Sequence, residues 1–237
     1  MGRASQVDEG VVVAASTEVG VLGSLVVRVD NAEVDLPQSR KARSLLAYLA
    51  VTQKPQRRER LCEIFWDVPD DPRAALRWNL SRLRHSVGDA LQSNRDAIWV
   101  DREKCALDFD RHGKAASADL ATVAIPELEA SAALYRGPFL DDLSLPRCPE
   151  YEAWRTAYAN ETELAQIRIL RALIDRLAES DPGRALTHAS ALERMSPEDG
   201  ALSAQVETLA DRSRREALAP GGPQVSAPSR HRPAQPA

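Results

Sequence analysis

The 237-residue sequence has few cysteines and histidines, the residues from which disulfides and zinc sites are built. Its three cysteines, Cys62, Cys105 and Cys148, are odd in number and far apart, with no CxxC spacing. This pattern argues against a disulfide framework or a zinc site and suits a reducing cytoplasm, so we expect small buried thiols. The four histidines form no group with the spacing of metal ligands. We therefore expect neither a metal nor a cofactor.

Sequence motifs of common enzymes are missing as well. There is no glycine-rich phosphate loop of the GxxxxGK[ST] kind, no HExxH and no GxSxG. We interpret the acidic pair Asp141-Asp142 as charges that flank a helix rather than as a general acid and base. Tyr135 and Trp154 are expected to be core anchors rather than a binding platform. The sequence thus predicts a protein that is not an enzyme.

No long apolar run or targeting segment is visible. The run at 11–15 is too short to cross a bilayer, and it follows Asp8 and Glu9, where a signal peptide carries positive charge. An initial Met-Gly can mark myristoylation, but Gln6 stands where that motif has Ser or Thr. We expect a cytoplasmic protein without a membrane partner.

Charge is unevenly distributed along the chain, although the net charge is only −4. Residues 38–88 contain eleven Lys and Arg against five Asp and Glu, a balance of +6. Residues 119–218 contain eleven Arg against eighteen Asp and Glu, a balance of −7. A basic block followed by an acidic one predicts two domains, the first of which meets a polyanion.

The first half of the chain contains both strands and helices. Residues 19–36 show the alternation of two strands around an Asp30-Asn31 turn. Three helices follow, with the expected bounds Ser39 to about Gln53, 57–66, and Pro72 to about Gly88. Ser39 can cap the first helix, and Asp70 or Asp71 can cap the third, whose first turn tolerates proline.

After the third helix the sequence returns to strands. AIWV (97–100) and CALDF (105–109), joined by the charged DREK, are interpreted as a hairpin. Strands, three helices and a hairpin in this order are typical of a winged helix-turn-helix. We predict such an α+β domain over residues 19–110, preceded by a disordered segment at 1–18.

From residue 119 onward the sequence is helical. Four segments broken by Pro and Gly lie at 120–135, 150–180, 182–195 and 197–218. Ala- and Leu-rich helix pairs of this length predict an all-α, tetratricopeptide-like helical array over 119–218. Residues 219–237 are rich in Pro, Gly and Ser and are expected to be disordered.

The third helix has two distinct faces. With Leu76 as the origin and about 100° per residue, Leu80, Leu83 and Val87 fall within about 40° of it and define a buried stripe. The outer face carries Ala74, Trp78, Ser81 and His85, with Arg77 and Arg82 on its flanks. Two further arginines, Arg73 and Arg84, lie nearer the stripe, and their stems can extend sideways over it.

This arrangement suits a helix that enters the major groove of DNA. Small residues let the backbone approach, arginines bond guanine edges or phosphates, and an apolar ring can touch a thymine methyl group. The predicted DNA-binding residues of the helix are Arg73, Arg77, Trp78, Ser81, Arg82, Arg84 and His85. The alternative is a surface helix with solvated arginines, in which Trp78 packs against the neighbouring domain.

Two other basic clusters are candidates for contacts with the DNA backbone. Arg40, Lys41 and Arg43 open the first helix, where unpaired N–H groups favour a phosphate; ordinary solvent exposure is the alternative. Arg102 and Lys104 lie in the expected hairpin turn, from which they could reach an adjacent minor groove or the backbone. Because turns are commonly charged, this second pattern is less specific.

These patterns resemble a known family. LGSLVVRVD, RKARSLLAYLA, RERLCEIFW and ALRWNLSRLRHSVG are similar to the amino-terminal, OmpR-type winged-helix domain of the Streptomyces antibiotic regulatory protein (SARP) family. Within them, SRLR at 81–84 resembles the family's recognition-helix phrase. LYRGPFL (134–140) and PEYEAW (149–154) look like the opening of the bacterial transcriptional activator domain that follows it. The resemblance covers residues 19–218.

The resemblance implies regulation of transcription. Members of the family bind direct repeats upstream of promoters and recruit RNA polymerase, and the loop before the recognition helix is one polymerase contact. Here that loop contains Asp67, Asp70 and Asp71. The helical domain of the family serves dimerisation or interdomain contacts, so a homodimer is one expectation. We predict a sequence-specific transcriptional activator whose partners are double-stranded DNA and RNA polymerase.

The sequence departs from the family pattern in three places. Gln56 and Arg57 replace an apolar residue and a typical helix-start residue, so the second helix should be less well capped. Asn79 takes the place of a common histidine. Relatives continue with further helices after the position of Leu218, and an array cut short should expose an apolar face. The chain would then be an amino-terminal fragment, a shortened member, or one completed by a partner.

The competing interpretation is a non-enzymatic protein-interaction or signalling module. In that interpretation the acidic helical array binds another protein, and the winged helix has weak or no specific affinity for DNA. Salt dependence separates the two, because log K for DNA falls with log salt by about 0.9 per phosphate contact.

Overall fold

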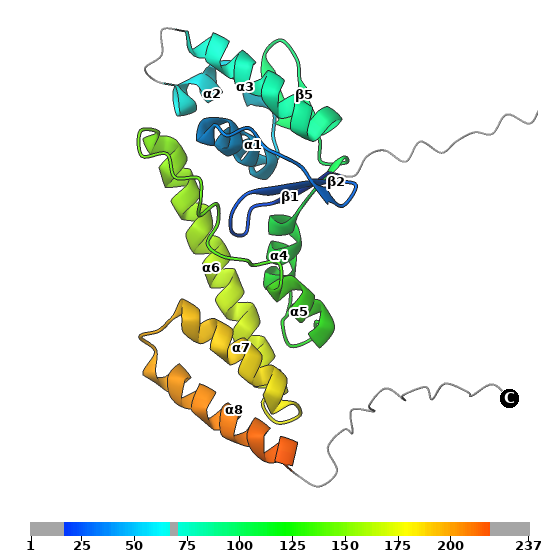
Figure 1. Cartoon of the computed structure of the whole chain (residues 1–237), viewed down its shortest axis with the longest axis vertical. Helices are drawn as coiled ribbons and strands as arrows, with labels where there is room; N and C mark the ends of the chain where they lie inside the picture. Colours follow the sequence, from blue (N-terminus) through cyan, green and yellow to red (C-terminus); the bar gives the residue numbers. More distant parts are fainter. Residues whose placement is uncertain (1–16, 67–70, 219–237) are drawn as a thin grey trace, which may run out of the picture. The chain divides into compact units, whose positions relative to one another are not determined.

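The computed structural model describes residues 17–66 and 71–218 (Figure 1). It divides into two compact units, of which the first ends at Ile169 and the second begins at Leu170. The boundary lies inside the long helix α6 (Pro149–Leu177). The sequence expectations for 1–16 and 219–237 fall outside the described residues.

Two small sheets belong to the first unit. One has the order β3 (Ala32–Glu33), β2 (Val26–Val29), β1 (Thr17–Gly20), β7 (Cys105–Leu107); the other has the order β4 (Gln56–Arg57), β6 (Ala97–Val100), β5 (Leu91–Ser93). Asp30 and Asn31, between β2 and β3, both have positive φ, as a tight hairpin turn requires, so the expected turn is confirmed. Thr17 and Glu18 belong to β1 rather than to a disordered segment.

The expected hairpin between 97–100 and 105–109 is wrong. β6 pairs with β5, with Leu91 opposite Val100, and residues 94–96 form the turn between them. β7 instead joins β1 in parallel, so residues 101–104 connect the two sheets. The β5–β6 pair is therefore the wing. Its turn is closed locally, because Asn94 Oδ1 accepts hydrogen bonds from the N–H groups of the second and third residues that follow it.

The three helices of the winged helix are α1 (Arg40–Thr52), α2 (Arg58–Phe65) and α3 (Pro72–Val87). Ser39 accepts a hydrogen bond from the Ala42 N–H and Asp71 from the Ala74 N–H, so both expected caps are confirmed. α2 has no side-chain cap, also as expected, and the residue at its start, Arg57, belongs to β4. A short 3₁₀ turn (Gly88–Ala90) leads from α3 into β5.

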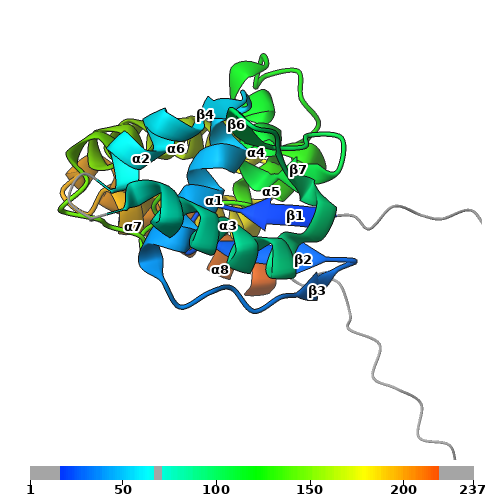
Figure 2. The same ribbon diagram turned by 90° about the horizontal axis from the view of Figure 1, so that it is seen from above.

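The helices and sheets of the first unit enclose one core. In Figure 1, α1 lies between the β1–β2 pair and the α2–α3 pair. Figure 2 gives the view onto α3, which runs along the outer side of α1. Leu45, Leu46 and Leu49 of α1 are fully buried between these layers. α3 is thus held at the surface of the unit by a central helix with no solvent-facing leucine.

Aromatic side chains join the first half of α6 to the winged helix. The Tyr151 ring packs on Phe65 of α2, with the centroids 5.4 Å apart. The Trp154 ring lies 4.9 Å from Tyr48 of α1 and 5.5 Å from Phe139. Trp154 is therefore a core anchor, as expected, but of a core shared with the winged helix. That core extends across the domain boundary expected between residues 110 and 119.

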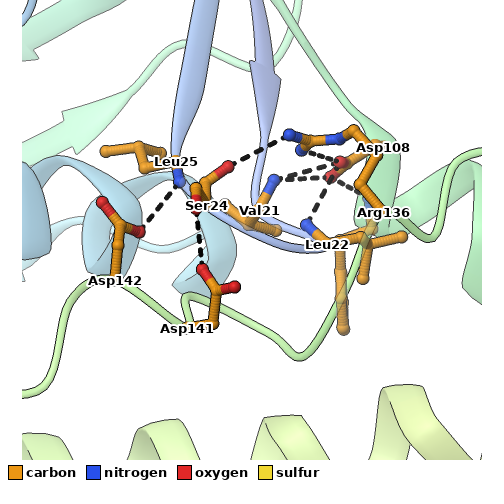
Figure 3. A network of polar contacts seen from close by, with 9 residues as sticks. Val21, Leu22, Ser24, Leu25, Asp108, Arg136, Asp141 and Asp142 are labelled. Carbon is orange, nitrogen blue, oxygen red and sulfur yellow. Dashed lines mark hydrogen bonds and ion pairs between the residues drawn. The ribbon is translucent and has the colours of Figure 1, made fainter. Parts of the chain in front are cut away.

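The helix α4 (Asp108–Ser117) begins where β7 ends, and it places one buried carboxylate beside β1 (Figure 3). Asp108 accepts hydrogen bonds from the N–H groups of Val21, at 2.9 and 3.0 Å, and Leu22, at 3.2 Å. The Arg136 guanidinium, 3.2 Å away, pairs with the same carboxylate. The segment that follows α5 (Ile125–Ala132) is thereby fastened to the turn after β1.

The acidic pair has a role different from the expected one. The Ser24 hydroxyl donates to Asp141, and the Leu25 N–H donates to Asp142 (Figure 3). Asp142 also pairs with Arg43 of α1, at 3.2 Å. These two residues therefore do not flank a helix. They hold the turn before β2 and the start of α1 in place.

The second unit contains the end of α6, α7 (Pro182–Met195) and α8 (Gly200–Leu218). α7 and α8 lie side by side as a helix pair (Figure 1), which is the predicted helical-array architecture. The start of α7 is capped by Asp181, whose carboxylate accepts from the Arg184 N–H. Arg212 of α8 pairs with Glu179 at 2.9 Å.

The apolar outer face expected on a shortened array is not observed. Leu202 and Leu209 of α8 are buried. Among the described residues, the exposed large hydrophobic side chains are Trp78, Leu164 and Leu218. Most of the exposed residues of α8 are charged, polar or alanine, so this helix presents a largely polar surface.

All three cysteines are buried, and none of them forms a disulfide. Burial raises the pKa of the Cys105 thiol to about 11 and also raises the pKa of Cys62, so both stay protonated at neutral pH. No helix in 17–66 or 71–218 is long and apolar enough to span a membrane. In the same ranges, no three His, Cys, Asp or Glu side chains are placed to hold a metal ion.

Candidate nucleic-acid interface

The inner face of α3 is the predicted one. Leu76, Leu80, Leu83 and Val87 are each no more than 3% exposed and pack into the core. Asn79 lies on this buried side as well. Its Nδ2 donates to the Ala75 carbonyl at 2.8 Å, so its amide is directed at the helix backbone.

Every DNA-binding residue predicted for α3 lies outside its buried stripe. All seven side chains are exposed: Arg73, Arg77, Trp78, Ser81, Arg82, Arg84 and His85. The Trp78 side chain is 55% exposed, so its ring is open to a partner. The buried stripe thus holds α3 in place, and the other sides of the helix present a cationic and aromatic surface to solvent.

The arginines of this face differ in their partners. Arg73 lies 3.4 Å from Glu59 and Arg77 lies 3.9 Å from Asp71, and both pairs are well exposed. Exposed ion pairs are worth about 0–1 kcal/mol, so a phosphate can displace either carboxylate at small cost. The guanidinium of Arg82 instead stacks over the Trp78 ring, 4.8 Å from its centroid.

Two polar contacts orient the last turns of α3. The Arg84 guanidinium donates to the Ser93 hydroxyl of β5 at 2.5 Å, which ties the helix to the wing. His85 Nδ1 lies 2.7 Å from the Ser81 carbonyl oxygen. Because a carbonyl can only accept, Nδ1 carries the hydrogen in this contact, and Nε2 is left for another partner.

A groove of about 730 Å³ separates α3 from the wing turn and the start of α2. It is lined by five arginines, Arg58, Arg73, Arg77, Arg84 and Arg95, and by the carboxylates of Glu59 and Asp96. Arg58 donates two hydrogen bonds to the Asn94 carbonyl, from Nε at 3.2 Å and Nη2 at 2.9 Å. This excess of positive charge on a concave surface suits a phosphate group.

Arg58 and Arg95 are not among the predicted residues. The wing turn was expected at DREK, whereas it is formed by Asn94, Arg95 and Asp96. Asn94 and Asp96, which are turn-forming residues directly before the apolar run AIWV at 97–100, are the signal that could have located it.

The basic residues at the start of α1 are not equivalent. The Arg43 guanidinium already pairs with Asp142, and the side chain is only about a quarter exposed. The Lys41 ammonium lies 6.0 Å from the Trp66 ring. Arg40 is exposed. Of the three, Arg40 therefore has the exposure that a backbone contact requires.

The two basic residues of the 101–104 connection lie outside the wing. Arg102 forms an ion pair with Asp110 and donates to the Ala50 carbonyl at 3.1 Å. The Lys104 carbonyl accepts from the Thr17 N–H, so its backbone continues the pairing of β7 with β1. Neither Arg102 nor Lys104 therefore belongs to the wing turn in which both were expected.

Of the expected polymerase contacts, only Asp71 lies among the described residues. Its carboxylate caps α3 through the Ala74 N–H at 2.8 Å. Asp67 and Asp70 fall in the range 67–70, outside them.

Comparison with known proteins supports the fold. No family model and no curated protein matches the chain. Among solved structures, EmbR of Mycobacterium tuberculosis, in complex with a low-affinity phosphopeptide, is similar at 21% identity and a TM-score of 0.51. The match covers 84% of this chain and 66% of that one, so the chain spans just under two thirds of the length of EmbR. The fold is a winged helix followed by a helical array, as the sequence predicts.

Proposed function

We propose that this protein binds DNA through α3 and regulates transcription in the manner of the SARP family. One observation carries the proposal: the buried leucine stripe fixes α3 at the surface, with four arginines, Trp78, Ser81 and His85 all exposed on its other sides. A folded chain has no structural need for this combination, whereas a major groove offers a partner for each group.

The exposed residues divide into two roles. Arg77, Ser81 and Arg82 read base edges, and each bidentate arginine–guanine pair contributes about 1–3 kcal/mol of discrimination. The other groove arginines, Arg73 and Arg84 with Arg58 and Arg95 added to the predicted set, hold the phosphate backbone between α3 and the wing.

The finer parts of the proposal rest on the sequence resemblance. The protein binds direct repeats upstream of promoters, pairs as a homodimer or in tandem, and activates transcription by recruiting RNA polymerase. The loop that precedes α3, with Asp67, Asp70 and Asp71, is the proposed polymerase contact. The fold shared with EmbR is compatible with this arrangement.

Charge reversal on α3 tests the interface. Arg82→Glu should lower affinity for duplex DNA at least tenfold, because a guanine or phosphate contact becomes a repulsion. Arg214→Glu makes the same charge change on α8, in the other unit, and should bind as the wild type does. Fluorescence anisotropy gives the affinities and circular dichroism confirms unchanged helix content. Retained affinity in Arg82→Glu would contradict the site assignment.

A further inference from the structure

Trp78 and Arg82 lie one helical turn apart and touch. Residues four apart share one side of a helix, and here the guanidinium carbon lies 4.8 Å from the centroid of the indole. An indole more than half exposed leaves a large apolar surface in contact with water, and burying that surface on binding is favourable. An apolar ring and a cationic guanidinium therefore lie side by side on the proposed DNA-binding face.

Arg82 differs from its neighbours in having its donors available. The other arginines of α3 have polar partners: Glu59 for Arg73, Asp71 for Arg77 and Ser93 for Arg84. Within 17–66 and 71–218, no carboxylate pairs with Arg82. When a guanidinium stacks on an aromatic ring through its flat face, the N–H groups in its plane stay open to a ligand. The Trp78 ring thus orients the Arg82 fork without occupying it.

The two groups lie close enough together to contact neighbouring base pairs. Their separation of 4.8 Å is more than one base-pair step of about 3.4 Å and less than two. In the major groove, a planar guanidinium matches O6 and N7 of guanine, whereas an apolar ring matches the C5 methyl group of thymine.

We propose that Trp78 and Arg82 act as one reading unit that recognises a thymine adjacent to a guanine. This inference rests on the proposed function, since it requires α3 to lie in the major groove. Trp78 is then a specificity-determining residue that contacts the thymine methyl group and also positions Arg82.

The test uses the full chain and a duplex selected from random DNA by that chain. Each thymine of the duplex is replaced in turn by deoxyuridine, which lacks only the methyl group, and affinity is measured by fluorescence anisotropy. One replacement should weaken wild-type binding about fourfold, the value expected for one buried methyl group. In Trp78→Ala the same replacement should change nothing. Leu164→Ala, which truncates an exposed hydrophobic side chain outside α3, should keep the wild-type pattern.

A second substitution addresses the guanine. Replacing the neighbouring guanine by 7-deazaguanine removes the N7 acceptor and should weaken the wild type. Arg82→Lys keeps the charge but loses the planar fork, so it should no longer distinguish the two bases. Its slope of log affinity against log salt should stay that of the wild type, because the number of phosphate contacts is unchanged.

Three results would overturn the inference. The first is an identical deoxyuridine pattern in the wild type and Trp78→Ala, and the second is a sensitive thymine that is not adjacent to the sensitive guanine. The third is a Trp78→Ala chain with wild-type DNA binding but lost activation, which would place the indole against a protein. If the wild type selects no sequence at all, the proposed function fails as well, so the two failures are distinguishable.

Discussion

Arg58 donates two hydrogen bonds to the backbone carbonyl of Asn94, and the first turn of α2 is thereby fixed to the turn of the wing. The contact between Arg84 and Ser93 fixes the end of α3 to the first strand of the same hairpin. The helix and the wing, which lie on either side of the arginine-lined groove, are therefore held in one arrangement before any ligand arrives. A prearranged surface binds more tightly because less conformational entropy is lost on association.

Loss of the Arg58 contact should weaken DNA binding with little effect on folding. Arg58→Ala removes both a groove charge and the tie to the wing, and we expect roughly a tenfold loss of affinity, about 1.4 kcal/mol. Arg57→Ala removes the same charge from the neighbouring position without touching Asn94. Anisotropy titrations of the two variants give the comparison, and equal affinities would show that the wing contact has no role in binding.

The Asp108 carboxylate should be among the most important polar groups for stability. Asp108→Ala leaves the Val21 and Leu22 N–H groups and the Arg136 guanidinium without their acceptor, so the free energy of unfolding should fall by about 3–5 kcal/mol. Asp141→Ala removes an exposed acceptor and should cost less than about 1 kcal/mol. Urea unfolding measures both. A small effect at Asp108 would mean that its bonds are replaced by water.

Stability should fall as the solution becomes more acidic than about pH 6.5. Burial lowers the pKa of His112, and this effect outweighs the opposite effects of the Gln166 hydrogen bond and the Asp108 charge. The unfolded chain then binds a proton more readily than the folded chain between the folded pKa and about 6.5, so unfolding becomes easier as pH falls through that window.

The contribution of His112 to this pH dependence is measurable by substitution. His112→Gln removes the titrating ring at a buried position. Urea unfolding between pH 7 and pH 5 should therefore show a shallower loss of stability in the variant than in the wild type. Parallel curves would show that other groups cause the acid sensitivity.

The winged helix should need the first half of α6 in order to fold. A fragment of residues 1–118 lacks Tyr151 and Trp154, so it exposes the faces of Phe65 and Tyr48 that these rings cover. We expect it to melt at a lower temperature than a fragment of residues 1–169, or to aggregate. Differential scanning calorimetry of both fragments checks this, and equal melting temperatures would support a domain that ends near residue 110.

Local signals in the sequence were sufficient for the three helices of the winged helix, whereas α4 was not predicted. The cap at Asp71, the proline after it and the leucines at helical spacing are all local to α3, and the structure confirms each of them. The Asp30-Asn31 turn was predictable for the same reason, since a two-residue turn has its own conformational requirement.

Contacts between distant residues could not be obtained in this way. The pairing of β7 with β1 joins residues 17 and 105, and three short strands of similar composition offer no pattern that selects this partner over β6. Arg43 looked like a free cation because its partner, Asp142, is 99 residues away. The groove was missed because its lining residues come from α2, α3 and the wing, which only the tertiary structure brings together.

Selection of bound sequences from random duplex DNA by the full chain, followed by affinity measurements over a salt series, tests the central claim most directly. We predict enrichment of a short repeated sequence and a linear fall of log affinity with log salt, by about 0.9 for each phosphate contact. The absence of any enriched sequence, with binding that is weak or undetectable at every salt concentration, would contradict the assignment of α3 as a DNA-reading helix.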